Sequence, residues 1–104
     1  MDKLTEIYFH YGTAIRQAHQ LDEIAAKLKN TANQDMERIL ENVSRVWKSP
    51  ESVPAYIRKG RKVEEDMQTT ADNIRNIAEV IRTIAERMKA TELATWEIAN
   101  ERNS

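Results

Sequence analysis

Both prolines of the chain, Pro50 and Pro54, lie in one short segment near its middle. Each proline removes a backbone N–H donor and pushes the residue before it away from helical geometry. Helix-forming residues dominate on either side, where the strongest breakers are Gly12 and Gly60. A long helical pattern must therefore stop and turn here, and the sequence predicts two helices joined by a bend.

The ends of these helices follow from the same breakers. The second helix is expected to start near Ser52 or Val53 with Pro54 at its first position, because a proline further in would clash with the carbonyl four residues back. Gly12 is expected to fray or bend the first helix before Thr13. We predict a single domain over 1–104, with a first helix over about 5–46, a bend over 47–53, a second helix over about 54–92 and a flexible tail over 93–104.

The first helix carries an apolar pattern that slips once. Steps of four and three place Ala14, Ala18, Leu21, Ala25, Leu28 and Ala32 on one face, as in a helix packed lengthwise on another. The pattern then resumes one position late, at Met36, Leu40, Val43 and Trp47. Such a stutter predicts local unwinding of a supercoil.

The second helix is more regular, because its large apolar residues keep a strict four-three alternation while alanines repeat every seven residues beside them. We expect the large residues to fill the contact between helices and Ala71, Ala78 and Ala85 to flank it. Two antiparallel helices make only one seam, so the predicted fold is an all-α antiparallel helical hairpin that dimerises into a four-helix bundle. The predicted hairpin and dimer seam comprises Leu21, Leu28, Met67, Ile74, Ile77, Ile81 and Ile84.

Charge gives little support to nucleic-acid binding. The chain has a formal net charge of −1, whereas nucleic-acid binders usually concentrate a basic excess on one face. Arg58, Lys59, Arg61 and Lys62 form a basic run, but Glu64, Glu65 and Asp66 follow at once. We interpret the run as a solvated face, with contact to phosphates or to an acidic membrane surface as the alternative.

Catalytic and metal-binding patterns are missing from the sequence. His10 and His19 are too far apart to share a helical metal site, no Glu-x-x-His occurs, and there is no cysteine or glycine-rich phosphate loop. Acidic neighbours such as Glu37 with Glu41, or Glu64 with Glu65, are interpreted as surface charges. We expect no enzyme activity, no metal and no cofactor.

Membrane insertion and a cleaved signal are not expected either. Residues 1–6 lack a charged-then-apolar signal pattern, and no apolar run approaches the roughly 20 residues needed to span a bilayer. If the protein leaves the cytoplasm, where it is made, we expect it to do so without a cleaved signal peptide.

The bend carries a resemblance to a known family. Trp47-Lys48-Ser49 ends the first helix, and Tyr56 follows near the start of the second. This arrangement resembles the WXG family of small type VII secretion substrates, which includes the early secreted antigenic target of mycobacteria. The resemblance implies a non-enzymatic helical hairpin that dimerises into a four-helix bundle and is exported folded by a system driven by a membrane ATPase. Trp47 and Ser49 are then the turn motif, with Ser49 in place of the usual glycine.

The family's C-terminal export signal is a tyrosine followed four positions later by an acid. The matching place here is Met88 with Glu92, where the acid is present and the aromatic is absent. Trp96 is a substitute aromatic, and the next acid is Glu101. Either these residues form a degenerate signal or a partner subunit carries it.

Three readings remain open from the sequence. The leading one is a secreted or secretion-associated hairpin that acts by protein–protein interaction, as a homodimer or with a related or effector helical subunit. The second is a cytoplasmic coiled-coil adaptor or regulatory subunit in which Trp47 is only structural. The third is a nucleic-acid-associated protein that uses the basic run.

Overall fold

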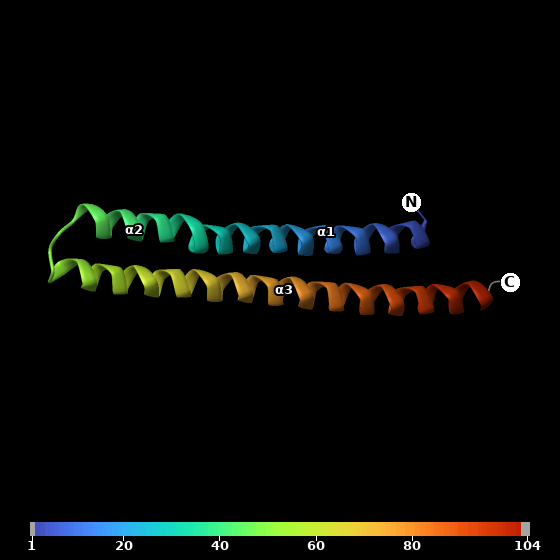
Figure 1. Cartoon of the computed structure of the whole chain (residues 1–104). Coiled ribbons are helices and arrows are strands. Elements are labelled where there is room, and N and C mark those ends of the chain that lie inside the picture. The colour runs from blue at the N-terminus through green and yellow to red at the C-terminus, as the bar shows by residue number, and fades with distance from the viewer. Residues whose placement is uncertain (1, 103–104) are drawn as a thin grey trace. The chain divides into compact units, whose positions relative to one another are not determined.

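The computed structural model describes residues 2–102 of the chain, which form helices and a bend without any strand. Figure 1 shows the order of the elements. They are α1 (Lys3–Asn30), the π-helix η1 (Thr31–Met36), α2 (Glu37–Val46) and α3 (Ser52–Arg102). The bend that separates α2 from α3 covers 47–51. The predicted all-helical class is confirmed.

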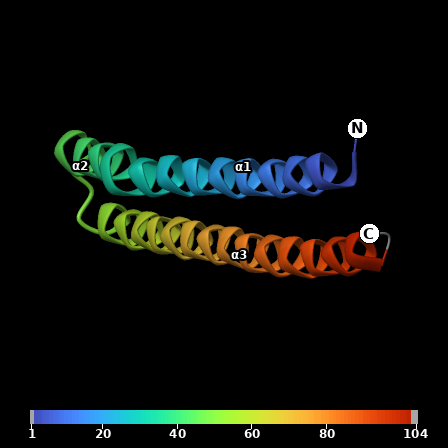
Figure 2. The same ribbon diagram turned by 90° about the vertical axis from the view of Figure 1, so that its right-hand side faces the viewer.

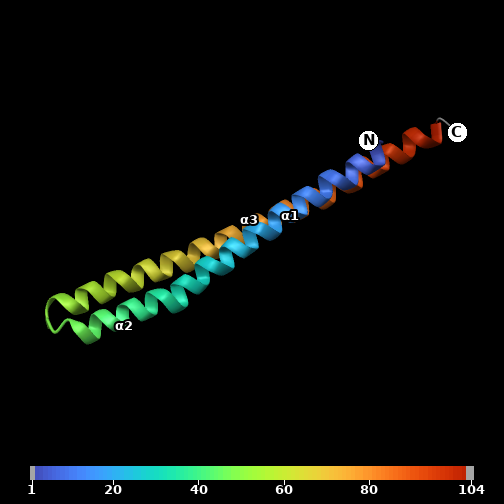
Figure 3. The same cartoon turned by 90° about the horizontal axis from the view of Figure 1, so that it is seen from above.

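The chain divides into two compact units. The single domain expected over 1–104 stays a prediction. The turn unit is Glu23–Arg75, in which the end of α1, η1 and α2 pack antiparallel against the first part of α3 (Figure 2). The terminal unit, described over 2–22 and 76–102, pairs the start of α1 with the later part of α3 (Figure 3). The turn unit by itself is a helical hairpin, and dimerisation stays a prediction.

The first helix begins earlier than expected and is continuous through Gly12. Asp2 supplies its N-cap, since Oδ1 accepts the N–H of Thr5 at 2.7 Å and the backbone carbonyl accepts the N–H of Glu6 at 3.0 Å. The Thr5 N–H lowers the pKa of Asp2 because it stabilises the carboxylate. The expected fraying before Thr13 is not seen, because α1 is helical from Lys3 onward.

The π-helix η1 lies where the apolar pattern slips. A π-helical turn holds about one residue more than an α-helical turn, so it shifts the following residues by one position around the helix. Ala32 at its start and Leu40 beyond its end are consequently both buried, although they lie eight residues apart. The sequence predicted a local irregularity here, and the irregularity is a π-helix.

Small residues, not large ones, form the centre of the contact between helices. In the turn unit Ala25, Ala32 and Ala71 are fully buried, and in the terminal unit Ala18 and Ala78 are fully buried. The backbones approach closely at alanines because no long side chain separates them. The expectation that large residues fill this contact and alanines flank it is therefore corrected. Leu21, Leu28, Met67, Ile74 and Ile81 are half-buried beside the alanines, whereas Ile77 and Ile84 are exposed.

The second helix starts at Ser52, within the expected start near Ser52 or Val53, but it is longer at its C-terminal end than expected. It includes Ser52 and Val53 before Pro54, and it continues to Arg102, where the sequence predicted an end near residue 92. The residues after Met88, where the apolar pattern weakens, thus extend the helix instead of ending it. Of the predicted tail over 93–104, residues 103 and 104 lie outside the described residues.

Candidate functional site

Ser49 determines how the bend enters α3. Its hydroxyl Oγ accepts the N–H of Ser52 at 3.2 Å, and its carbonyl accepts the N–H of Val53 at 3.2 Å. A serine in this place satisfies donors that the first helical turn leaves free. Ser49 therefore caps the start of α3, and Pro54 is the third residue of that helix instead of the first.

Trp47 ends α2 by taking an extended conformation, with φ −94° and ψ 127°. Its own N–H still donates to the carbonyl of Val43 at 3.0 Å. None of the described non-glycine residues has a positive φ. Ser49 can replace glycine in the turn motif because the backbone there does not require one.

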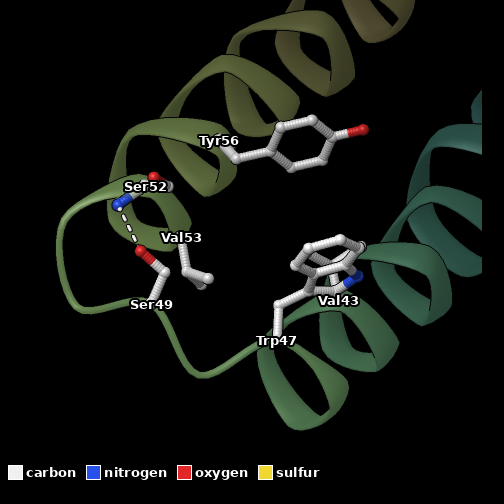
Figure 4. Close-up of a pocket in the computed structure, with 6 residues that line it drawn as sticks. All are labelled: Val43, Trp47, Ser49, Ser52, Val53 and Tyr56. Atoms are coloured by element: carbon white, nitrogen blue, oxygen red, sulfur yellow. Dashed lines mark hydrogen bonds between the residues drawn. The ribbon is translucent and has the colours of Figure 1, made fainter.

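The turn unit has a hollow beside the bend, with a volume of about 310 Å³. Trp47, just after the end of α2, and Tyr56 of α3 lie on facing sides of it, and Val53 lies near the bend (Figure 4). Trp47 is 67% exposed and Tyr56 is 59% exposed. An aromatic pair that is this open contributes little to the interior, and exposed apolar surface of this kind is typical of interaction sites. The hollow is lined by Val43, Trp47, Ser49, Ser52, Val53 and Tyr56.

The turn unit presents two chemically different flanks on either side of its buried residues. Residues three and four positions after a buried residue flank it on its two sides, about 100° apart around the helix, and in an antiparallel pair equivalent sides meet. On the polar flank, Lys29 Nζ lies 2.9 Å from Asp72 Oδ1, and Gln68 Nε2 donates to Asn33 Oδ1 at 2.6 Å. On the apolar flank lie Ile24, Leu28, Val43, Tyr56, Val63, Met67 and Ile74.

The terminal unit repeats this division. On its polar flank Arg82 pairs with Asp22, and Tyr11 donates to Glu86. Its apolar flank consists of Ala14, Leu21, Ile77, Ile81, Ile84 and Met88. Ile77 is 53% exposed and Ile84 is 49% exposed. In both units, polar contacts tie the helices together on one side while apolar side chains stay open on the other.

Tyr11 belongs to the best-connected polar group of the terminal unit. Lys89 Nζ lies 3.9 Å from the centre of the Tyr11 ring and 3.4 Å from Glu86 Oε2. The hydrogen bond to Glu86 raises the pKa of Tyr11 and lowers the pKa of Glu86, because it needs a protonated phenol and an ionised carboxylate.

The candidate export residues all lie on α3. Met88 and Glu92 line one hollow with Ile7 and Tyr11, and Glu92 lines a second hollow with Trp96 and Lys3. Glu92 and Trp96 are half-buried and one helical turn apart, whereas Met88 and Glu101 are exposed. The structure therefore brings Glu92 and Trp96 together as neighbours on one helix.

The basic run contributes fewer open charges than its sequence indicates. Arg61 pairs with Glu37 and Glu64, and Lys62 Nζ lies 3.2 Å from Asp66 Oδ1. Arg58 and Lys59 are exposed on α3. The cluster of Glu37, Arg61 and Glu64 was missed from the sequence, because its two acids come from different helices and each was assigned to a surface pair with a neighbour.

Metal binding and membrane crossing find no support in the described residues. No group of three or more histidine, cysteine, aspartate or glutamate side chains there is arranged to hold a metal ion. Within the same part of the chain, no helix has both the length and the apolarity that crossing a membrane requires.

Comparison with known proteins gives no family. No protein-family model, no curated protein and no solved structure matches the chain. The apolar flanks and the aromatic hollow at the bend are therefore the features from which a function is argued.

Proposed function

We propose that this protein acts by protein–protein interaction as a small, non-enzymatic type VII secretion substrate or secretion partner of the WXG kind. It works as a dimer of helical hairpins, either with a second copy or with a related or effector subunit. The secretion-system ATPase recognises the folded complex, which leaves the cytoplasm without a cleaved signal peptide.

The observation that carries this proposal is the uneven distribution of polar contacts in both units. Ion pairs and hydrogen bonds on the polar flanks join the two helices of one chain, whereas the apolar flanks leave isoleucine and valine side chains half exposed. Burying such side chains stabilises an association by roughly 25 cal/mol for each Å² removed from water. A second helical pair is the partner that such a flank fits, as in a four-helix bundle.

The bend supports the second part of the proposal, which is recognition. Trp47 is largely exposed although it lines an apolar hollow, whereas a purely structural tryptophan would be expected to be covered. Exposed tryptophan and tyrosine side chains are typical of interaction sites. We assign the hollow between Trp47 and Tyr56 to engagement with the secretion machinery or a partner subunit.

The dimer is tested by light scattering on the purified chain. A homodimer has a mass of twice 12.1 kDa, that is 24.2 kDa. Ile77→Glu and Ile84→Glu place a charge on the apolar flank and should shift the species to a monomer, whereas Thr83→Glu, at an exposed position away from that flank, should not. A monomeric wild-type chain with weak helicity would point instead to a separate partner subunit, which co-purification from its host would identify.

Recognition at the bend is tested by secretion from a host that has a type VII system. Trp47→Ala should reduce export while the circular dichroism of the purified protein stays strongly helical. Wild-type export of this variant would refute the assignment of Trp47. Retention of the wild-type chain in the cytoplasm would favour the alternative function, a coiled-coil adaptor that docks its apolar flanks on a larger protein.

The third possibility, a nucleic-acid role for the basic run, has a separate test. Arg61 and Lys62 are already paired with acids, which leaves Arg58 and Lys59 as the cations of the run without a recorded ion pair among the described residues. Retention on heparin with a steep salt dependence would support that role, and passage through the column at low salt would remove it.

A further inference from the structure

Two glutamates and one arginine meet on the polar flank of the turn unit. Arg61 of α3 pairs with Glu37 of α2, and its Nη1 also lies 3.3 Å from Oε1 of Glu64. The Glu64 side chain is only 14% exposed. Its Oε2 is buried and has no hydrogen-bond donor among the described residues. A buried carboxylate oxygen without a donor is costly, so it requires an explanation.

A proton provides that explanation. The carboxyl groups of Glu37 and Glu64 lie close to each other, because both contact the same nitrogen, Nη1 of Arg61. Two ionised carboxylates at that separation repel strongly, whereas one proton between them turns the repulsion into a hydrogen bond. The hydrogen bond with Glu37 raises the pKa of Glu64, and the hydrogen bond from Arg61 lowers the pKa of Glu37. Glu64 thus favours the protonated state, and Glu37 favours the ionised state.

The other charged groups near the cluster have contacts of their own. Glu41 and Arg45 of α2 line a hollow with Arg61, and Arg45 donates to Asn42. In η1, Asp35 Oδ1 lies 4.0 Å from Arg38 Nη2, and on α3 Lys62 pairs with Asp66. Among the described residues, Arg61 is the cation recorded in contact with the two carboxyl groups.

We propose that Glu37 and Glu64 share one proton in the folded turn unit and, together with Arg61, form a proton-sensitive latch between α2 and α3. With the proton in place, the ionised Glu37 and Arg61 cancel and the neutral Glu64 donates to Glu37. When the proton leaves, the cluster has a net charge of −1 and both carboxyl groups become acceptors. The latch then holds only through Arg61.

The direction of the pH dependence follows from these protonation states. For Glu64 the folded-state pKa is raised, so its stabilising contribution is present at low pH and is lost as pH rises through the folded-state pKa. For Glu37 the folded-state pKa is lowered, so its contribution is present above the unfolded-state pKa and is lost as pH falls. The latch is therefore strongest between the lowered folded-state pKa of Glu37 and the raised folded-state pKa of Glu64, and it loosens outside that range.

The test is a carboxyl ¹³C NMR titration of the full chain, labelled at glutamate. Glu64 should titrate above the ordinary range of a glutamate, and Glu37→Gln should move its midpoint downward, because the proton-sharing partner is gone while Arg61 remains. Glu65→Gln removes the same charge from the exposed neighbouring glutamate and should leave the Glu64 midpoint in place. A Glu64 midpoint in the ordinary range, or one that Glu37→Gln does not move, would overturn the proposal.

A second variant separates the latch from a general charge effect. Glu64→Gln is uncharged at every pH, and its amide can donate to Glu37 as the protonated acid would. Thermal unfolding of this variant should lose the decline that the wild type shows as pH rises from the glutamate range towards neutrality. Persistence of the full wild-type decline in Glu64→Gln would show that other groups cause it and would also overturn the proposal.

Discussion

Gly60 of α3 lies directly against Leu40 of α2. A Cβ atom on Gly60 would overlap Leu40 Cδ2 and would lie 3.3 Å from Leu40 Cγ. Leu40 is itself only 2% exposed, so its side chain has little room to move away. The absence of a side chain at Gly60 therefore leaves the space that the Leu40 side chain occupies between α2 and α3.

This contact predicts that Gly60→Ala destabilises the protein, although alanine is the better helix former by about 1 kcal/mol. Overpacking costs typically about 1–3 kcal/mol, which outweighs the gain. Chemical denaturation should show the loss. Gly12→Ala is the matched control, because the nearest side-chain atom to its Cβ would be Arg16 Nη1 at 3.7 Å, so this change should be stabilising.

A double-mutant cycle identifies the cause of the Gly60 effect. In a Leu40→Ala background the obstructing side chain is gone, so Gly60→Ala should become neutral or stabilising. An equal loss in both backgrounds would mean that the effect does not come from Leu40.

The close contact at the buried alanines predicts that the same alanine-to-leucine change has different effects on stability at buried and exposed positions. Ala78→Leu adds a long side chain at a fully buried position of the terminal unit and should cost about 1–3 kcal/mol or more. Ala90→Leu makes the same chemical change at an exposed position of α3 and should be near neutral. The two midpoints of thermal unfolding give the comparison, and similar midpoints would contradict a close alanine contact.

Loss of the α3 cap is the third prediction. Ser49→Ala removes the acceptor for the Ser52 N–H and should cost about 1 kcal/mol. Ser44→Ala, in the interior of α2, should have the opposite sign, because alanine is preferred over serine inside a helix. Urea denaturation of both variants measures the difference. A Ser49→Ala protein as stable as the wild type would show that the hydroxyl does not act as a cap.

We predict that the protein loses free energy of unfolding at alkaline pH because of Tyr11. Its pKa is raised in the folded state, so folding favours the protonated phenol, and this contribution is lost as pH rises through the folded-state pKa. Tyr11→Phe removes the hydrogen bond to Glu86 and should flatten this alkaline decline in melting temperature. Tyr56→Phe changes an exposed tyrosine at the bend and serves as the control. An unchanged decline in Tyr11→Phe would assign it to other groups.

The sequence was sufficient for the helices and the place of the bend, because Pro50 and Pro54 leave few other arrangements. It also located the irregularity after Ala32, since the one-position slip is visible in the apolar spacing. The role of the alanines was missed because a seven-residue repeat of small residues beside a repeat of large ones does not tell which of them faces the neighbouring helix. Which repeat faces the neighbouring helix depends on how closely the two backbones approach each other.

Two further misses have different causes. The extension of α3 to Arg102 was missed because a weak apolar pattern was taken for the end of the helix, whereas helix-forming residues can continue a helix without a regular apolar face. The contact of Glu37 with Glu64 was missed because it joins two helices, and its register depends on the residue that the π-helix adds. Local spacing alone does not contain that information.

The π-helix η1 also determines which changes of chain length the protein can tolerate. Deleting one residue within Thr31–Met36 should allow α1 and α2 to merge into one regular α-helix, in which Ala32 and Leu40 keep their inward direction. Deleting one residue within α2 instead would turn every later residue of that helix by about 100° and move Trp47 away from the hollow. The segment is thus a place where insertions and deletions can accumulate between relatives without loss of the fold.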